Sequence, residues 1–220
     1  MKFFLDSAKT DEIAYALDMW SLDGVTTNPR HILASGKPFR TVLGEIAELV
    51  KGTTKPVSVE INPHLTDYAA MAAEGESLAH LSPNFVIKLP ATEAGFRAIP
   101  LLEAKGIHTN LTLVFSAAQA LQAARMGATF VSPFIGWKES NGEEVSQFVE
   151  EVVRIYRNYS YKTEIIVAAV RNGRQIVEAA VAGAHIVTAA LDVYKDAFDH
   201  PFTHVGLQRF GDAWDKTSHE

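Results

Sequence analysis

Cysteine is missing from this 220-residue chain. Its absence excludes disulfides, thiolate metal sites and a cysteine nucleophile, although it says little about the cellular compartment. An excess of basic residues is also missing, because 20 Lys and Arg face 26 Asp and Glu, which gives a net charge of −6. Since no block of Lys or Arg occurs either, we do not expect the protein to bind nucleic acid.

Long apolar runs are absent as well. No stretch approaches the length of a membrane span, and the first segment reaches Asp6 after three apolar residues, too few for the core of a signal peptide. The apolar and charged contents, 47% and 21%, are ordinary for a globular protein. We therefore expect a soluble cytoplasmic protein with no membrane association.

Metal-ligand spacing is absent among the eight histidines. None forms a paired motif on one helix, so we interpret them as surface or packing residues, such as His31, His64, His108 and His185. We predict neither a metal nor an organic cofactor.

Short apolar runs alternate with stretches of helical periodicity from end to end. Strands are predicted over residues 2–6, 24–27, 56–61, 84–88, 109–113, 129–134, 164–169 and 185–188. Residues 143–159 show the helical pattern, with apolar side chains at three- and four-residue steps. Gly106, Gly127 and Gly183 each follow a helical pattern and precede a strand, where a left-handed cap is usual.

Eight strand–helix units with no linker predict an α/β fold, a single (β/α)8 TIM barrel over residues 1–220. A doubly wound open sheet is the weaker alternative, because no Gly-rich phosphate loop follows the first strand. Beyond the eighth unit, residues 201–217 are expected to form an extra amphipathic C-terminal helix after the break at His200-Pro201. That helix would cover the barrel or pack on a neighbouring subunit.

Lys88 ends the apolar run of residues 84–88, where burial disfavours the charged form of its amine and leaves a nucleophile for carbonyl carbons. The alternative is a strand-end lysine that extends to solvent. Two carboxylates at strand ends could move protons for it, Asp6 and Glu60. Asp6 could equally cap the first helix, whereas Glu60 shares the inner face of its strand with Ser58 unless it is simply exposed. Facing inward, Glu60 needs a partner, which Thr112 or a water would supply.

Polar side chains occupy the ends of most other predicted strands, and in a (β/α)8 barrel these ends meet on the catalytic face. This concentration suggests a site, although strand ends also collect polar residues by chance. Asn28 precedes a proline, so a local Asx-turn is its alternative role. The set comprises Thr26, Thr27, Asn28, Asn110, Thr112, Ser132 and, just past the seventh strand, Arg171.

In these same segments the chain resembles the transaldolase family, including its short members and the related fructose-6-phosphate aldolases. The matching segments are Phe4-Leu5-Asp6, Asp23-Gly24-Val25-Thr26-Thr27-Asn28-Pro29, Val57-Ser58-Val59-Glu60, Val86-Ile87-Lys88-Leu89-Pro90-Ala91-Thr92, Asn110-Leu111-Thr112-Leu113-Val114-Phe115-Ser116 and Ser132-Pro133-Phe134-Ile135-Gly136. The Gly-Val-Thr-Thr-Asn-Pro segment together with the strand lysine is highly specific.

The resemblance implies a role for each strand-end residue. Lys88 would form a Schiff base with the ketone carbon of a ketose, and Asp6 would be the acid and base for C3–C4 cleavage. Glu60 and Thr112 would hold the water that relays protons. The substrate-binding residues would be Thr26, Asn28, Asn110, Ser132 and Phe134. The resemblance to short members also implies a homo-oligomer.

Two positions resemble the transaldolases rather than the aldolases, which carry Gln at the position of Glu60 and Tyr at that of Phe134. A phenol could help protonate the bound carbanion and release dihydroxyacetone, whereas the phenyl ring of Phe134 cannot. Transfer to an acceptor aldehyde is therefore expected over release.

The chain departs from the family where the substrate phosphate would bind. Trp137 stands at the position of an arginine, and Ala169 in Ala168-Ala169-Val170-Arg171 stands at that of a serine. Arg171 remains, and Arg30 replaces the usual serine after Pro29. Either Arg30 compensates for Trp137 and the ligand is still a phosphate, or the anionic group has changed.

A sulfonate fits this set of side chains, Arg30, Trp137 and Arg171. It carries a single charge, whereas a phosphate monoester carries close to two and favours bidentate arginine. We therefore predict a donor such as 6-deoxy-6-sulfofructose, which would give 3-sulfolactaldehyde and pass its three-carbon unit to glyceraldehyde 3-phosphate. The alternatives are an ordinary sugar-phosphate transaldolase, an aldolase acting as a lyase, and a barrel that only binds. The retained amine, carboxylates and Thr112 argue against the last.

Overall fold

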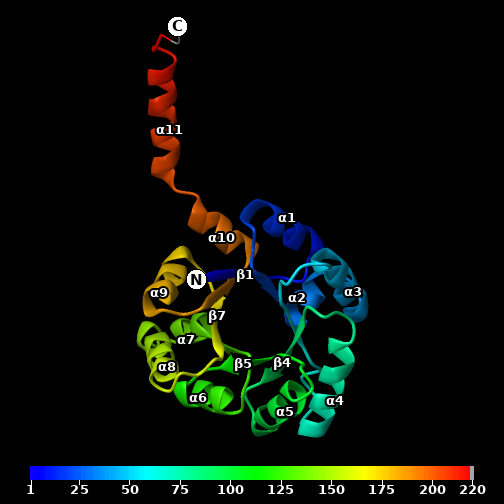
Figure 1. Ribbon diagram of the computed structural model, residues 1–220. Helices are drawn as coiled ribbons and strands as arrows, with labels where there is room; N and C mark the ends of the chain where they lie inside the picture. Colours follow the sequence, from blue (N-terminus) through cyan, green and yellow to red (C-terminus); the bar gives the residue numbers. More distant parts are fainter. Residues whose placement is uncertain (219–220) are drawn as a thin grey trace.

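Eight parallel strands close into a barrel in the computed structural model, which describes residues 1–218 (Figure 1). The strands follow the chain order around the barrel, and β1 pairs with β8 to close it. They are β1 (Lys2–Asp6), β2 (Gly24–Thr26), β3 (Val57–Glu60), β4 (Phe85–Pro90), β5 (Thr109–Val114), β6 (Phe130–Pro133), β7 (Glu164–Val170) and β8 (Ile186–Ala189). The (β/α)8 prediction is confirmed, and the open-sheet alternative is wrong because the sheet closes.

Helices surround the barrel and alternate with its strands (Figure 1). They are α1 (Thr10–Trp20), α2 (Pro29–Ala34), α3 (Phe39–Val50), α4 (Tyr68–Ala79), α5 (Glu93–Glu103), α6 (Ala117–Arg125), α7 (Ile135–Ser140), α8 (Ser146–Asn158), α9 (Gly173–Ala182), α10 (Leu191–Phe198) and α11 (Pro201–Trp214). The left-handed glycines are confirmed, because Gly106, Gly127 and Gly183 have φ of 73°, 85° and 88°. The helix expected over 143–159 is α8, slightly shorter at both ends.

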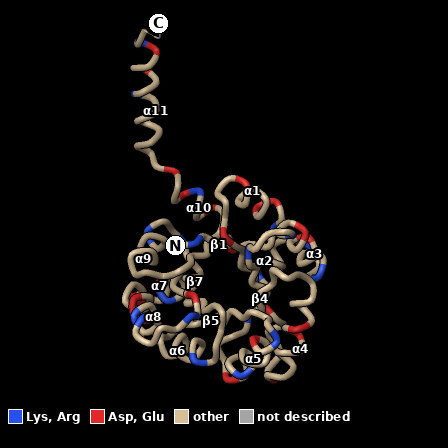
Figure 2. Tube along the Cα trace, in the orientation of Figure 1, with Lys and Arg blue, Asp and Glu red and all other residues tan. Residues whose placement is uncertain are grey.

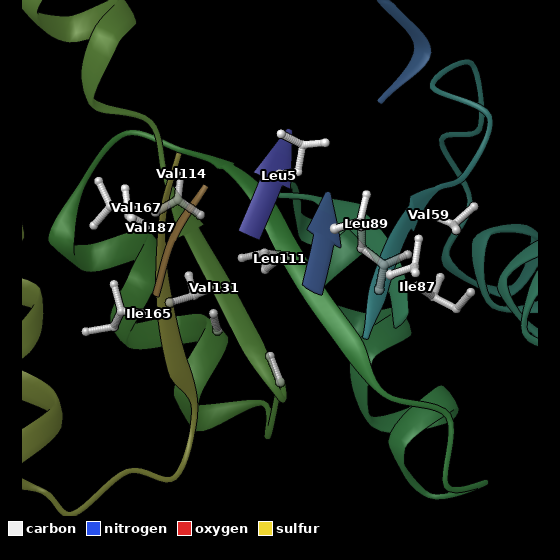
Figure 3. Close-up of a cluster of buried hydrophobic side chains, with 14 of the residues drawn as sticks. Leu5, Val59, Ile87, Leu89, Leu111, Val114, Val131, Ile165, Val167 and Val187 are labelled. Atoms are coloured by element: carbon white, nitrogen blue, oxygen red, sulfur yellow. The ribbon is translucent and has the colours of Figure 1, made fainter. Parts of the chain in front are cut away.

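Two apolar layers follow from strand alternation. Side chains on the outer face of the strands, such as Leu5, Ile87 and Val131, belong to the large core shared with the helices (Figure 3). Their neighbours on the inner face form a separate cluster, in which the rings of Phe4 and Phe130 meet across the barrel at 6.3 Å. This inner plug fills the barrel below the site and consists of Phe4, Val86, Phe130, Ile166 and Ile186.

Two strands carry one extra residue. β5 pairs with β6 through Leu111–Val131 and next through Val114–Pro133, and β7 shows the same shift against β8. Each extra residue makes a bulge, which locally bends its strand. Leu113 and Ala169 lie in these bulges, and both adopt left-handed conformations with φ of 57°.

The C-terminal helix α11 extends away from the barrel (Figure 1). None of its residues is buried, so it does not cover the barrel, and that alternative is wrong. The helix ends at Trp214 rather than at residue 217, because the last N–H groups, those of Lys216 and Thr217, bond only three residues back and form a turn. Charged residues lie mostly on the helices and loops around the barrel, and few lie on its strands (Figure 2). Within residues 1–218, no helix is long and apolar enough to cross a membrane.

Candidate active site

A cavity of about 570 Å³ opens at the carboxyl ends of the strands. Strand alternation explains its polar lining, because the residue two positions beyond each member of the inner plug faces the same side. On the inner face of the strands, the next residue after Phe4 is thus Asp6. In the same way Lys88 comes after Val86, Ser132 after Phe130 and Thr188 after Ile186. The predicted residues that line the cavity are Asp6, Thr26, Asn28, Arg30, Glu60, Lys88, Ser132, Phe134, Trp137 and Arg171.

The Lys88 side chain lies at the base of this cavity and is 4% exposed. Its Nζ donates to the carbonyl oxygen of Thr27 at 3.0 Å and lies 3.4 Å from Oε2 of Glu60. The Glu60 contact follows from strand register, since Glu60 and Lys88 are paired residues of β3 and β4. The alternatives of a solvent-directed lysine and a solvent-exposed Glu60 are wrong, because the Glu60 side chain is only 13% exposed.

Asp6 sits at the end of β1 and is held from two sides. Its Oδ1 accepts from the Thr26 hydroxyl at 2.7 Å, and its Oδ2 lies 3.1 Å from Nε2 of His31. Burial raises the pKa of Asp6, but the hydrogen bond and charge of His31, the charge of Lys88 and the Thr26 bond together lower it below its ordinary value. The helix-cap alternative is wrong, because Lys9 occupies the N-cap of α1.

The Thr112 hydroxyl is buried and makes no hydrogen bond among the described residues. A direct bond to Glu60 is therefore not formed, which leaves the water of the sequence prediction as the remaining partner. A buried hydroxyl without a partner costs about 1–3 kcal/mol. Thr112 lies in β5, next to the strand that carries Lys88.

Asn110 pairs with Lys88 across β4 and β5 and is fully buried. Its amide nitrogen donates to the Ser58 hydroxyl at 3.0 Å, and its amide oxygen accepts from the Ser132 hydroxyl at 2.8 Å. These two bonds direct the amide nitrogen of Asn110 towards β3 and its amide oxygen towards β6. Asn110 and Thr112 are not among the cavity-lining residues, so the cavity reaches Ser132 but not the amide behind it.

Asn28 caps helix α2, as the local alternative proposed. Its Oδ1 accepts from the backbone N–H groups of Arg30 and His31 at 3.0 and 3.1 Å. The cap orients the first turn of α2 towards the cavity, where Arg30 and His31 both contribute to the wall. Asn28 also lines the cavity, so the same residue caps the helix and forms part of the site.

Three aromatic rings form a cluster at the outer wall of the cavity. Phe134 lies 5.7 Å from Phe115 and 5.8 Å from Trp137, and Phe115 and Trp137 are 5.9 Å apart, measured between ring centroids. Trp137 is nevertheless 46% exposed, since it lies in the short helix α7 at the rim. The cluster fixes the indole plane while leaving its outer edge accessible.

Arg171 reaches the same rim from the end of β7. Its Nη1 donates to the Ser140 hydroxyl of α7, and the guanidinium passes close to Gly136. A Cβ at Gly136 would lie 2.0 Å from the carbonyl oxygen of Ala169 and 3.0 Å from Nε of Arg171. Only glycine therefore lets α7 approach the β7 bulge this closely.

Two polar residues of the cavity wall were not predicted as part of the site. The interpretation of His31 as a surface or packing residue is wrong, because it lines the cavity and pairs with Asp6. Thr188 of β8 bonds to Thr26 at 2.6 Å. It lies two residues after Ile186, so strand alternation could have identified it from the sequence as a residue of the inner face. The spacing of the histidines along the chain gives no signal for the pairing of His31 with Asp6. Among residues 1–218, no group of three or more His, Asp or Glu side chains is placed to hold a metal ion.

Buried next to one carboxylate and sharing its cavity with another, Lys88 has what nucleophilic attack with proton transfer requires. The family model "Transaldolase/Fructose-6-phosphate aldolase" matches residues 3–220. Proteins of Priestia aryabhattai and Priestia megaterium named "6-deoxy-6-sulfo-D-fructose transaldolase" are 60% identical over 99% of this chain and 96% of their own length. A protein of Aquifex aeolicus named "Probable transaldolase" is 47% identical over 98% of this chain and 97% of its own.

The barrel is also similar to a solved structure of thiamine phosphate pyrophosphorylase from Pyrococcus furiosus. The TM-score is 0.64, with 13% sequence identity, over 89% of this chain and 91% of the other. At this identity the likeness concerns the fold alone.

Proposed function

This chain belongs to the transaldolase/fructose-6-phosphate aldolase family, as a transaldolase, and we propose that it transfers a dihydroxyacetone unit through a Schiff base on Lys88. The observation that carries the proposal is the buried Nζ of Lys88, 3.4 Å from Glu60, in a cavity that also contains Asp6. A desolvated amine can attack a ketone carbon, and carboxylates within reach can move the protons that imine formation requires.

Imine formation uses Glu60 and Thr112. The Lys88 amine adds to the C2 ketone of the donor, and the resulting carbinolamine loses water. Glu60 lies beside the amine, and the Thr112 hydroxyl has no protein partner among the described residues. Together they would hold the water that carries protons between the amine and the C2 oxygen, in both formation and hydrolysis.

Cleavage uses Asp6 as the base. It takes the proton of the C4 hydroxyl as the C3–C4 bond breaks, and the electron pair moves into the enamine on Lys88 while the aldehyde leaves. The acceptor aldehyde then adds to the enamine carbon, and Asp6 returns the proton to its oxygen. Asn28 and Ser132 would bind the hydroxyls of the three-carbon unit, with Asn110 holding the Ser132 hydroxyl and Thr26 orienting Asp6.

Phe134 favours transfer over release. Free dihydroxyacetone forms only if the enamine carbon is protonated, and the phenyl ring offers no acidic proton for that step. Its two aromatic neighbours also shield that wall from water. The enamine would therefore persist until an acceptor binds.

We propose a sulfonated donor, 6-deoxy-6-sulfofructose, which would release 3-sulfolactaldehyde, with glyceraldehyde 3-phosphate as the acceptor. Three side chains suited to a singly charged anion line one cavity, Arg30, Trp137 and Arg171. The relatives named for 6-deoxy-6-sulfo-D-fructose support the same donor. Because both substrates carry anions, the rim would bind a sulfonate and a phosphate in turn.

A sugar-phosphate donor is the second candidate, since Arg30 and Arg171 supply two cations to the cavity. A donor comparison separates the two. The kcat/KM of transfer to glyceraldehyde 3-phosphate should be higher for 6-deoxy-6-sulfofructose than for fructose 6-phosphate. A clear preference for the phosphate would overturn the sulfonate assignment and leave the transaldolase chemistry intact.

The Schiff base is tested by trapping. Borohydride added with a ketose donor should attach a three-carbon unit to Lys88, located by peptide mass spectrometry; an unmodified Lys88 would refute imine chemistry at this site. In parallel, a donor mixed with an acceptor should give new ketose faster than free dihydroxyacetone. The opposite ranking would support a lyase.

We further propose that the chain forms a single barrel domain, as predicted for residues 1–220, of which 219–220 lie outside the described part, and that its C-terminal helix α11 packs on a neighbouring copy in a homo-oligomer. The helix has no buried residue, yet it presents the large apolar side chains Phe202, Leu207 and Phe210. Light scattering after gel filtration should give the mass of an oligomer for the full chain and of a monomer for a chain ending at residue 200. Monomeric full-length protein would contradict the proposal.

A further inference from the structure

A histidine–carboxylate pair forms one side of the catalytic cavity. His31 Nε2 lies 3.1 Å from Asp6 Oδ2, and the two side chains are 28% and 21% exposed. The partial burial matters, because an ion pair or a hydrogen bond sheltered from water is stronger than the same contact on an open surface. No step proposed above uses the imidazole.

The local fold fixes the place of His31. Helix α2 starts at Pro29, and Asn28 accepts the backbone N–H of His31, which locks the first turn. The imidazole is thereby directed back towards the end of β1. Thr26 holds the other oxygen of Asp6 and is itself bonded to Thr188. Each carboxylate oxygen thus has its own partner from a separate element.

From this geometry we propose that His31 is a positioning residue that keeps Asp6 ionised and fixes the orientation of its carboxylate. The inference rests on the acid/base role proposed for Asp6. A base must be a carboxylate before the C4 hydroxyl arrives, and its free lone pairs must point at that proton. His31 supplies the hydrogen bond that favours the ionised form, and Thr26 prevents rotation.

Other charges around Asp6 do not replace His31. Lys88 of β4 lines the same cavity, whereas the phenol of Tyr194 in α10 donates to the carbonyl oxygens of Phe4 and Val187 instead. Lys88 becomes part of the imine during catalysis and bonds to the substrate, so its contribution changes from step to step. The contact with His31 requires no bond to the substrate and can persist throughout.

A second cavity of about 350 Å³ shares Asp6 and His31 with the first. Its other charged residues come from α1 and its preceding loop, Lys9 and Glu12, and from α10, Asp192 and Lys195. Lys9 and Glu12 pair with each other at 2.9 Å. Lys195 lies over the ring of Tyr15, 4.7 Å from its centroid, so His31 is the basic group of this cavity that bonds to Asp6.

Proton balance is consistent with a positioning role. Asp6 takes a proton from the donor and returns the same proton to the acceptor. Neither half of the transfer therefore needs His31 to accept a proton. If the ring only orients and stabilises the carboxylate, its replacement should lower kcat and leave the binding of the donor nearly unchanged.

The test compares His31→Gln and His31→Leu with the parent protein in steady-state transfer from pH 3 to 9. Leu removes every polar contact, and we expect kcat to fall about 10- to 100-fold with KM within about 3-fold. The acid limb of kcat/KM should move to higher pH, because the pKa of Asp6 rises without its partner. Gln retains an N–H donor and should keep part of the rate.

The matched control is His108→Gln, at the opposite end of the barrel. His108 also faces a carboxylate, with Nδ1 3.7 Å from Oε2 of Glu103, and is 63% exposed, so its loss should leave kcat and the pH profile unchanged. Thermal unfolding verifies that each variant is folded. Should His31→Leu unfold, the shift is measured on His31→Gln.

Two results would overturn the inference: an acid limb that stays in place in every folded His31 variant, or a rise of KM with kcat retained. The second would assign the ring to substrate binding. Failure of the proposed function looks different, because borohydride would then leave Lys88 unmodified in the parent protein. With the inference and the function both correct, His31→Gln still forms the adduct on Lys88.

Discussion

The base of the cavity and its rim are built differently. At the base, Asp6, Glu60 and Lys88 stand on strands, and their mutual positions follow from strand pairing and from hydrogen bonds to neighbouring strands. At the rim, Arg30 and Trp137 stand on the short helices α2 and α7, outside the sheet. A substitution at the base disturbs paired strands, whereas a substitution at the rim mainly alters side chains that are in contact with solvent. The chemistry and the choice of anionic group can therefore vary separately.

Burial separates the two regions in energetic terms as well. The Lys88 side chain is 4% exposed, whereas Trp137 is 46% exposed. Electrostatic interactions are stronger where water is excluded, so each polar group at the base contributes more than its counterpart at the rim. The predictions below test this contrast, in order of decreasing effect.

Lys88→Met should break the base of the site. The substitution keeps the approximate volume and removes the nucleophile, so we expect transfer to fall by about 10⁴-fold or more and the borohydride adduct to disappear. Initial rates and intact mass measure both. Lys105→Met removes an exposed lysine paired with Glu76 and should behave like the parent. Appreciable transfer by the Lys88 variant would contradict the contrast.

Thr112→Val should separate activity from stability. It replaces a buried hydroxyl without a protein partner by a methyl group, so the free energy of unfolding should rise by about 1 kcal/mol while imine formation slows about 10- to 100-fold. Urea unfolding and single-turnover adduct formation measure the two effects. Thr109→Val, on the same strand, removes a hydroxyl bonded to Glu103 at 2.6 Å and should lose stability without losing rate. A joint loss in the Thr112 variant would indicate a structural role instead.

Trp137→Arg should change the rim alone. A guanidinium suits a doubly charged phosphate, so the ratio of kcat/KM for fructose 6-phosphate over sulfofructose should rise about 10-fold. Trp137→Phe keeps a ring against Phe115 and Phe134 but removes the indole N–H, and it tests whether that donor matters. An unchanged ratio in both variants would show that the indole does not select the donor.

Acid unfolding should show the smallest effect. The pKa of Asp6 is lower in the folded protein than its ordinary value of 3.8, so its ionised form stabilises the fold above that value. This stabilisation is lost as pH falls through 3.8 towards the folded pKa. Asp6→Asn should therefore be less stable than the parent near pH 6, and the difference should shrink near about pH 3.5. A difference that is the same at both pH values in urea unfolding would contradict the shift.

Much of the base could be predicted from the sequence, because alternation with period two is a local property. It placed Glu60 on the inner face of its strand, and the ends of apolar runs located Asp6 and Lys88 at strand ends, which parallel strands necessarily bring together. The cavity lining confirms that placement. The roles of these residues in the reaction remain predictions.

The rim and His31 could be predicted only in part. Arg30 and Trp137 were identified because they depart from the pattern of the transaldolase family, but the pairing of His31 with Asp6 depends on where α2 packs, which no local pattern specifies. The sequence equally left Asn28 with two roles, and the structure assigns its oxygen to the cap of α2. The bulges at Leu113 and Ala169 depend on the neighbouring strand and have no signature in their own segments.

The bulge in β7 has a consequence for how such a barrel can diversify. The bulge absorbs the extra residue locally, because Ala168 and Ala169 together occupy the place opposite Thr188 and Val170 still pairs with Ala189. Deleting Ala169 would return β7 to regular pairing, yet Arg171 would keep its side of the strand. The extra residue instead widens the wall, since Ala168 and Ala169 both line the cavity. Lineages could therefore reshape this part of the wall by gaining or losing one residue while the cation beyond it stays in place.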